Sequence, residues 1–220
     1  MATTDNREDY LINILRLSGD GDGVVRTSEL SDLMGVSPAS VSEMVKTLSE
    51  EGLVDYVRYK GATLTERGRE LAMKIRRKHH IAERFLTDVM DMDMEDAHQE
   101  ACRFEHHMSD ESADKLCRMI GPKIDDDCAY CTDPCHDAGA MIGDTPLSEL
   151  EKGGCGRISY LKCEDAEKIK KLISMGFVPG RDVSMVSAVS GNGPRIVKVG
   201  DSAIALDKEL SSLIYIESAN

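Results

Sequence analysis

The chain has 220 residues, of which 41% are hydrophobic and 30% are charged, as in a soluble globular protein of one to three domains. Its net charge of −13 by itself disfavours nucleic-acid binding. No apolar run approaches the ~18 residues of a membrane-spanning helix, and the polar, acidic first nine residues lack a signal-peptide pattern. We therefore expect a cytoplasmic protein without a membrane partner.

Charge and composition divide the chain into four segments. Residues 1–64 alternate short helical patterns with one hairpin, and residues 65–121 are strongly helical. Residues 122–152 form an acidic, Cys-rich linker, and residues 153–220 are predicted to form mainly strands. Residues 1–78 hold 12 basic and 13 acidic side chains, against 15 and 27 in the remainder. Because the acidity lies outside the first segment, a local basic patch there can still meet DNA.

Three short helices are predicted in the first segment. Apolar residues at helical spacing, from Tyr10 to Leu17, indicate the first helix. The second begins at an N-cap, Thr27 or Ser28, and stops at Gly35. The third has Ser37 as N-cap and Pro38 at its first position. Two short helices joined by a tight glycine turn are typical of a helix-turn-helix.

The third helix has a small, polar outer face that suits a DNA major groove. After it, residues 53–64 are predicted to form a hairpin with Gly61 at the turn, which completes a winged helix-turn-helix. The alternative is a helical hairpin packed for stability only, but the basic wing favours DNA. The candidate DNA-contacting residues are Thr27, Ser37, Pro38, Ala39, Ser40, Ser42, Glu43, Lys46, Arg58 and Lys60.

Residues 65–121 carry a dense set of metal-binding side chains. A long helix from Thr65 to about Asp88 places His79 and Glu83 on one face, four residues apart. A second helix over about 94–107 presents a stripe of His98, Cys102, Glu105 and His106. Imidazole, thiolate and carboxylate together suit Fe, Co, Ni and Zn. A single histidine is more often an ordinary core or surface residue, but a core stripe would carry Leu at these positions.

Two runs make a resemblance specific: RKHHIAERFLTD at 77–88 and HQEACRFEHHMSD at 98–110. They closely resemble the diphtheria toxin repressor family of metal-dependent transcriptional regulators, most of all its iron-dependent type. The resemblance implies a mainly α fold with a small β domain. Its parts would be a winged helix-turn-helix (1–64), a helical dimerisation and metal-binding domain (65–121), the linker (122–152) and a C-terminal SH3-like, FeoA-type β-barrel (153–220). It also implies a homodimer that binds double-stranded operator DNA, and not an enzyme.

The resemblance implies two metal sites in each subunit. The ancillary site would use His79, Glu83 and His98. The primary site would use Asp9, Cys102, Glu105 and His106, with Asp9 supplied by the first helix. Asp165 matches a further acidic ligand that the barrel would add to the ancillary site, whereas Lys168 stands where an amide ligand is expected and cannot bind metal while protonated.

This mixed donor set bears on which metal binds. Cys102 is typical of iron-responsive members and favours Fe(II), Co(II), Ni(II) or Zn(II), whereas Asp9 is typical of manganese-responsive members and keeps Mn(II) open. We expect an Fe(II)-activated repressor of metal homeostasis genes, with a manganese-responsive regulator as the alternative. A metalloenzyme with Glu83 or Glu105 as general base is disfavoured, because no nucleophile motif accompanies these residues.

The linker contains a cluster that the family pattern lacks. Its C-x2-C-x3-C-H spacing suits a structural Zn(II) site or an iron–sulfur cluster. A redox-labile disulfide, and a flexible linker without fixed ligands, stay open. With a cluster or disulfide here, the chain would be a redox sensor. The residues concerned are Cys128, Cys131, Cys135 and His136.

Overall fold

The computed structural model describes residues 4–19, 23–121, 144–162, 165–189 and 193–218. The chain forms two compact units. The first comprises residues 1–79 and 102–107, and the second comprises residues 80–101 and 108–220. The predicted linker ligands Cys128, Cys131, Cys135 and His136 lie outside the described residues.

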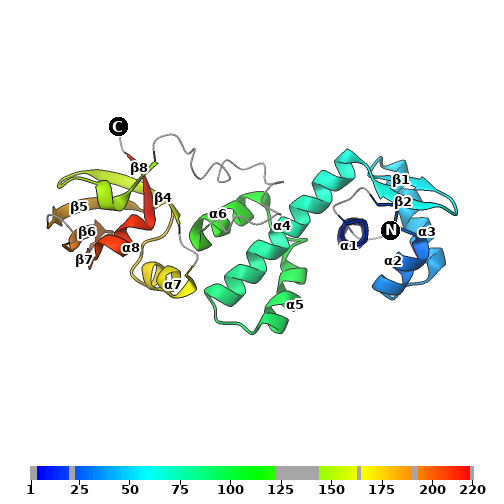
Figure 1. Cartoon of the computed structure of the whole chain (residues 1–220), viewed down its shortest axis with the longest axis horizontal. Helices are drawn as coiled ribbons and strands as arrows, with labels where there is room; N and C mark the ends of the chain where they lie inside the picture. The colour runs from blue at the N-terminus through cyan, green and yellow to red at the C-terminus, as the bar shows by residue number, and fades with distance from the viewer. Residues whose placement is uncertain (1–3, 20–22, 122–143, 163–164, 190–192, 219–220) are drawn as a thin grey trace. The chain divides into compact units, whose positions relative to one another are not determined.

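Three helices form the start of the first unit (Figure 1): α1 (Thr4–Leu17), α2 (Thr27–Met34) and α3 (Pro38–Glu50). Their apolar stripes meet in one core, which explains the helical spacing of the sequence. The fully buried side chains of this core include Leu11, Ile14, Leu30, Val41, Val45 and Leu48. The prediction of three helices with these inward faces is confirmed.

The ends of these helices follow local chemistry, with one correction. Ser37 caps α3 by accepting a hydrogen bond from the backbone N–H of Ser40 (3.1 Å), and Gly35 ends α2 in the left-handed conformation, as predicted. The N-cap of α2, however, is Arg26, so the prediction of Thr27 or Ser28 was wrong. Here the backbone N–H of Arg26 donates to Glu29 Oε2 at 2.7 Å, so the acidic residue of the first turn satisfies the helix start.

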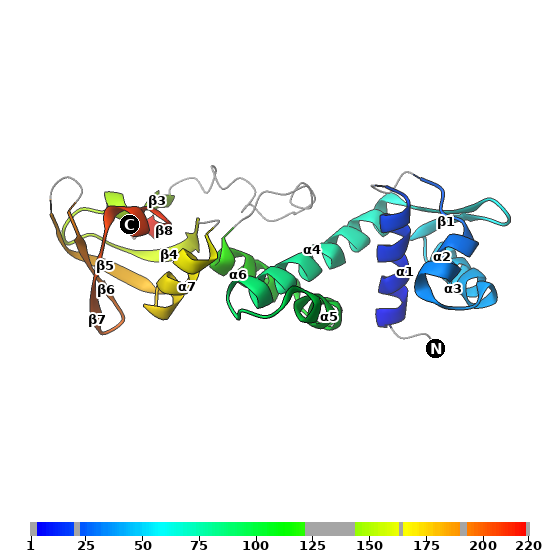
Figure 2. The same ribbon diagram turned by 60° about the horizontal axis from the view of Figure 1, so that its bottom comes forward.

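Strands β1 (Val54–Val57) and β2 (Gly61–Leu64) pair as an antiparallel hairpin, whose loop projects from the helices as a wing (Figure 2). Two residues of the wing have positive φ: Tyr59 (φ 67°) in the loop, and Gly61 (φ 130°), the first residue of β2. A Cβ at Gly61 would also lie 2.5 Å from the carbonyl oxygen of Val25, which pairs with Ala62. Both the backbone conformation at the end of the turn and the close packing therefore favour glycine at position 61.

The start of helix α4 (Glu66–Asp88) is hydrogen-bonded to the segment that leads into the hairpin. The Thr65 hydroxyl donates to the carbonyl of Gly52 (2.9 Å) and accepts from the backbone N–H of Gly68 (3.1 Å). The backbone N–H of Thr65 donates to the carbonyl of Leu53 (3.1 Å). These bonds fix the first turn of α4 to the winged helix, and so fix the direction in which it carries His79.

Helix α4 is followed by α5 (Met94–Phe104), whose first eight residues belong to the second unit, and by α6 (Asp110–Ile120) of that unit. The predicted second helix therefore ends three residues early, so that Glu105 and His106 lie in the turn after it. The last turns of α4 pack on α6 through a small core that contains Ile81, Ala113, Cys117 and Ile120. The apolar faces of α4 and α6 are thus buried against each other.

A six-stranded antiparallel sheet forms the C-terminal part, in the order β3-β8-β4-β5-β6-β7. It surrounds an aliphatic core with Phe177 at its centre. The Gly-bounded strands predicted after residue 153 are present, whereas α8, of five residues, was too short to predict. The elements are β3 (Asp144–Pro146), η3 (Leu147–Glu149), β4 (Cys155–Leu161), α7 (Ala166–Ser174), β5 (Asp182–Ala188), β6 (Arg195–Val199), β7 (Ser202–Leu206), α8 (Lys208–Ser212) and β8 (Ile214–Ser218).

Across the described parts of the chain, the helices are too short or too polar to cross a lipid bilayer.

The junction of hairpin and α4 yields a prediction about Gly68, where a Cβ would lie 1.9 Å from the carbonyl oxygen of Leu53. Alanine normally favours a helix over glycine by about 1 kcal/mol. Here we expect Gly68→Ala instead to lower the free energy of unfolding of the first unit by about 1–3 kcal/mol, because the backbone must shift. Urea denaturation followed by circular dichroism measures this. Lys74→Ala, at an exposed position of α4, is the control; a Gly68→Ala protein as stable as this control would contradict the packing argument.

Candidate metal centre

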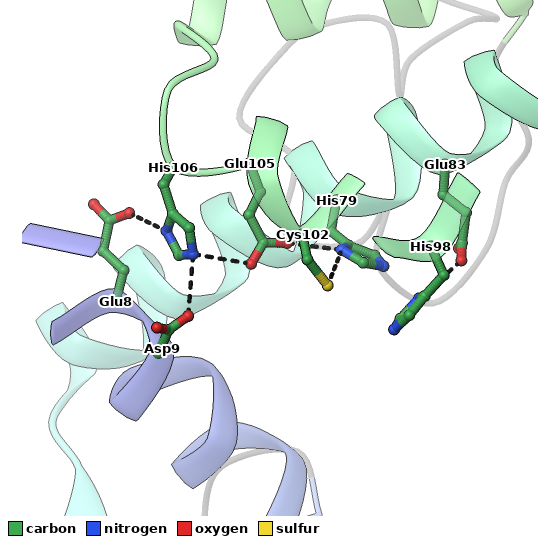
Figure 3. A network of polar contacts seen from close by, with 8 residues as sticks. All are labelled: Glu8, Asp9, His79, Glu83, His98, Cys102, Glu105 and His106. Atoms are coloured by element: carbon green, nitrogen blue, oxygen red, sulfur yellow. Dashed lines mark hydrogen bonds and ion pairs between the residues drawn. The ribbon is translucent and has the colours of Figure 1, made fainter. Parts of the chain in front are cut away.

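Four elements of the first unit converge on one small region (Figure 3). Asp9 comes from α1, His79 from α4 and Cys102 from the last turn of α5. Glu105 and His106 follow in the turn after α5. Tyr10 and Leu11 anchor α1 in the core, which leaves Asp9 at the edge of the helix facing this turn.

Two carboxylate groups lie beside Nε2 of His106. Its Nε2 lies 3.1 Å from Asp9 Oδ1 and 3.3 Å from Glu105 Oε1. Ligand atoms from these three residues all lie within 4.8 Å of one another. Ligands bound at about 2.1 Å lie up to about 4.2 Å apart around one ion, so one imidazole and two carboxylates fit a divalent cation here. Glu105 is buried, and a buried carboxylate needs such compensation.

The other nitrogen of the same ring meets a residue that was not predicted. His106 Nδ1 lies 2.8 Å from Glu8 Oε2. Burial lowers the pKa of His106, but the hydrogen bond to Glu8 and the charges of Glu105 and Asp9 together raise it above its ordinary value. Glu8 gave no signal in the sequence, because its neighbour Asp9 already filled the first-helix position that the resemblance implies.

Glu105 is shared between two histidines. Its Oε2 accepts a hydrogen bond from His79 Nδ1 at 2.7 Å, while its Oε1 faces His106. Cys102 Sγ lies 3.8 Å from His79 Nδ1, and its thiol is exposed. Of the predicted primary ligands, Asp9 and Glu105 lie beside the ring of His106. The fourth, Cys102, lies beside His79, on the other side of the Glu105 carboxylate.

Two further predicted ligands form a pair in the second unit. His98 Nδ1 on α5 lies 3.0 Å from Glu83 Oε1 on α4. Both side chains are partly exposed. Of the predicted ancillary set, His79 belongs to the first unit, and Glu83 and His98 belong to the second.

Asp165 has a structural role of its own. It is the N-cap of α7 and accepts hydrogen bonds from the backbone N–H groups of Glu167 (3.0 Å) and Lys168 (3.3 Å). The ammonium of Lys168 pairs with Glu209 at 2.5 Å. These contacts account for the carboxylate of Asp165 as a helix cap and for Lys168 as an ion-pair partner.

The predicted DNA-contacting residues lie at the start of α2, on α3 and its N-cap, and on the wing. Ser37, Pro38, Ala39, Ser40, Glu43, Lys46, Arg58 and Lys60 are exposed, and Thr27 and Ser42 are half-buried. The sequence reading did not single out Tyr59, which is 91% exposed between the two basic wing residues. The Arg58 guanidinium stacks over its ring, 5.0 Å from the centroid. An exposed aromatic side chain between basic residues was the signal available in the sequence.

Comparisons with known proteins cover each part of the chain. Residues 2–62 match the family model of the iron dependent repressor N-terminal DNA binding domain. Residues 65–128 match the iron dependent repressor metal binding and dimerisation domain, and residues 145–218 match the FeoA domain. The fold class predicted from the sequence is therefore confirmed.

Curated relatives match this chain over nearly its whole length and theirs. The diphtheria toxin repressor of Corynebacterium glutamicum is 28% identical, over 97% of this chain and 96% of its own. The iron-dependent repressor IdeR of Mycobacterium tuberculosis is 28% identical, over 97% of each chain. A solved structure of a manganese-dependent transcriptional repressor in complex with manganese is 23% identical over 97% of this chain and 100% of its own, with a TM-score of 0.48. Given these domain matches and relatives, the chain belongs to the diphtheria toxin repressor family of metal-dependent transcriptional repressors.

Proposed function

We propose that this protein is an Fe(II)-activated repressor that binds double-stranded operator DNA as a homodimer to control metal homeostasis genes. The observation that carries the proposal is the meeting of Asp9, on α1 of the DNA-binding segment, with Glu105 and His106. A bound divalent ion would supply positive charge between these two carboxylates and the imidazole. The ligands then hold α1 to the turn after α5.

Helix α1 is also attached to the helix that we assign to the major groove. Arg7 lies on the same turn of α1 as Asp9, and its guanidinium pairs with the carboxylate of Glu51, the C-cap of α3, at 2.8 Å. Leu11 and Ile14 share the buried core with Val41 and Val45 of α3. We infer that fixing Asp9 favours one orientation of α3, which sets the spacing of two recognition helices in a dimer.

The choice of Fe(II) rests on Cys102, and a specific observation keeps Mn(II) as the alternative. The cluster of Asp9, Glu105 and His106 offers two oxygens and one nitrogen, a set that also accepts manganese. Cys102 Sγ lies 3.8 Å from His79 Nδ1, and the same nitrogen contacts Glu105 Oε2 at 2.7 Å. We propose that its thiolate completes the primary site and favours Fe(II), and that Co(II), Ni(II) or Zn(II) could take its place in vitro. In addition we propose that His79, Glu83 and His98 supply the ancillary ligands.

Removing Asp9 tests the connection between metal and DNA. We expect Asp9→Ala to bring DNA affinity in the presence of Fe(II) down to the metal-free level, a loss of about 5- to 150-fold, because α1 loses its ligand. Anaerobic fluorescence anisotropy, on a DNA fragment selected with the metal-loaded wild-type protein, measures this. Glu70→Ala removes the same charge from an exposed position of α4 and is the control. Wild-type protein that binds this DNA equally with and without metal would refute the proposal.

Cys102 tests the identity of the metal. We expect Cys102→Ala to lower affinity for Fe(II) or Co(II) by about 10-fold or more and for Mn(II) much less, because a thiolate contributes more to the softer ions. Competition titration with a metal-sensitive dye gives both constants. Cys155→Ala, which removes another exposed thiol, is the matched control. Equal losses for both ions would mean that the thiol does not select iron.

The wing tests the DNA-binding face. We expect Arg58→Ala to weaken DNA binding by the metal-loaded protein and to reduce the slope of log affinity against log salt by about one, because one phosphate contact is lost. Lys74→Ala removes an exposed positive charge from α4 and should leave the slope unchanged. If both variants changed the slope alike, a general charge effect would replace the wing contact.

A further inference from the structure

We propose that Glu8 is a positioning residue for the metal centre: it holds the His106 imidazole so that Nε2 faces Asp9 and Glu105. This inference rests on the proposed function, since it concerns the same site. It goes beyond it by adding a residue that is not itself a ligand. Glu8 and Asp9 are consecutive on α1, and they meet the two nitrogens of one ring from opposite sides (Figure 3).

The two ring nitrogens have different partners, and this decides which one can bind a metal. Nδ1 lies 2.8 Å from Glu8 Oε2, whereas Nε2 faces Asp9 Oδ1 and Glu105 Oε1. A carboxylate can only accept a hydrogen bond, so Glu8 keeps the proton on Nδ1. When a metal ion takes the place of a proton on Nε2, the ring is neutral and its Nε2 lone pair is directed at the ion that Asp9 and Glu105 would also bind. A carboxylate behind a ligating histidine fixes the tautomer and ring orientation and raises the basicity of the ligand.

The surroundings make this hydrogen bond stronger than one at the surface. The side chain of His106 is 8% exposed and that of Glu8 is 18% exposed, so little water competes for either partner. A hydrogen bond with an ionised acceptor is roughly twice as strong as one between neutral groups. Asp9, in contrast, is half-exposed and can exchange its partner for a metal. Glu8 and Asp9 therefore have different roles: Glu8 orients the ring, and Asp9 offers a ligand oxygen.

The contact of Glu8 also places α1. Through it, the N-terminal half of α1 lies beside His106, with Asp9 next to the position that an ion would take. A prearranged site loses less conformational freedom on binding than a site that must be assembled. We therefore expect Glu8 to contribute to metal affinity through ring orientation and through the placement of α1.

Co(II) titration of the full chain, followed by visible absorption, tests the proposal. Glu8→Ala should lower Co(II) affinity by about 10- to 100-fold, as loss of a carboxylate behind a ligating histidine does. Glu8→Gln keeps an acceptor oxygen and should recover most of that affinity, with an unchanged Co(II) absorption band. Asp9→Ala should change the band itself, because a ligand is lost. Glu70→Ala is the control for charge.

A second readout reports the tautomer directly. In the Zn(II)-loaded protein with ¹⁵N-labelled histidine, the His106 signal should show a protonated Nδ1 in wild type and in Glu8→Gln. In Glu8→Ala this proton should exchange fast with water and its signal should be lost. Because Glu8→Gln keeps the size and hydrogen bond of the side chain, it decides the question even if Glu8→Ala does not fold.

Several outcomes would overturn the proposal. Wild-type affinity in Glu8→Ala would show that the contact does not position the ring. A changed Co(II) band in Glu8→Gln, like that of Asp9→Ala, would make Glu8 a ligand. An exchanging Nδ1 proton in Glu8→Gln would also count against it. Wild-type protein that binds no Co(II) would overturn the proposed function and this inference together, whereas intact wild-type binding with unaffected Glu8 variants overturns the inference alone.

Discussion

The arrangement of the DNA-binding unit depends on the contact between the second turn of α1 and the turn after α5. In this contact the ring of His106 meets Glu8, which is 98 positions away in the chain, and Asp9, which is 97 positions away. It concentrates three carboxylates, from Glu8, Asp9 and Glu105, around one imidazole. Such an excess of negative charge in a poorly hydrated place costs free energy unless cations or protons compensate it. A divalent cation bound at the proposed site would compensate this charge, and a proton on His106 would compensate part of it.

The rest of the first unit converts this local contact into a defined geometry. Helix α1 is embedded in the same core as α3, and Thr65 attaches the start of α4 to the hairpin. Close packing at Gly61 and Gly68, where a side chain would overlap backbone, leaves little freedom between these elements. A displacement of Asp9 would therefore be transmitted to the helices packed against α1, since these helices share one buried core with it. That rigidity would allow the proposed metal ligand on α1 to influence the helix that we assign to the major groove.

The metal-binding residues show where sequence reasoning succeeds and where it stops. His79, Glu83, His98 and Cys102 could be found because helical spacing brings them to common faces, and the resemblance then added Asp9. Helical spacing could not show that Glu105 lies between His79 and His106, because α5 ends at Phe104 and the following turn redirects both side chains. Nor could it find Glu8, whose partner is distant in the chain, or the left-handed Tyr59 at the wing, where glycine would be expected.

The sequence by itself determined the elements and their inward faces, because apolar periodicity, the Ser37 cap and the Gly35 stop act within a few residues. Together with the resemblance, it also determined the family and the set of candidate ligands. Only the tertiary structure decided how these ligands are grouped: Asp9, Glu105 and His106 around one ring, Cys102 beside His79, and Asp165 as a helix cap. The physical reason is that hydrogen bonds and ion pairs between distant segments depend on packing directions, which local spacing does not encode.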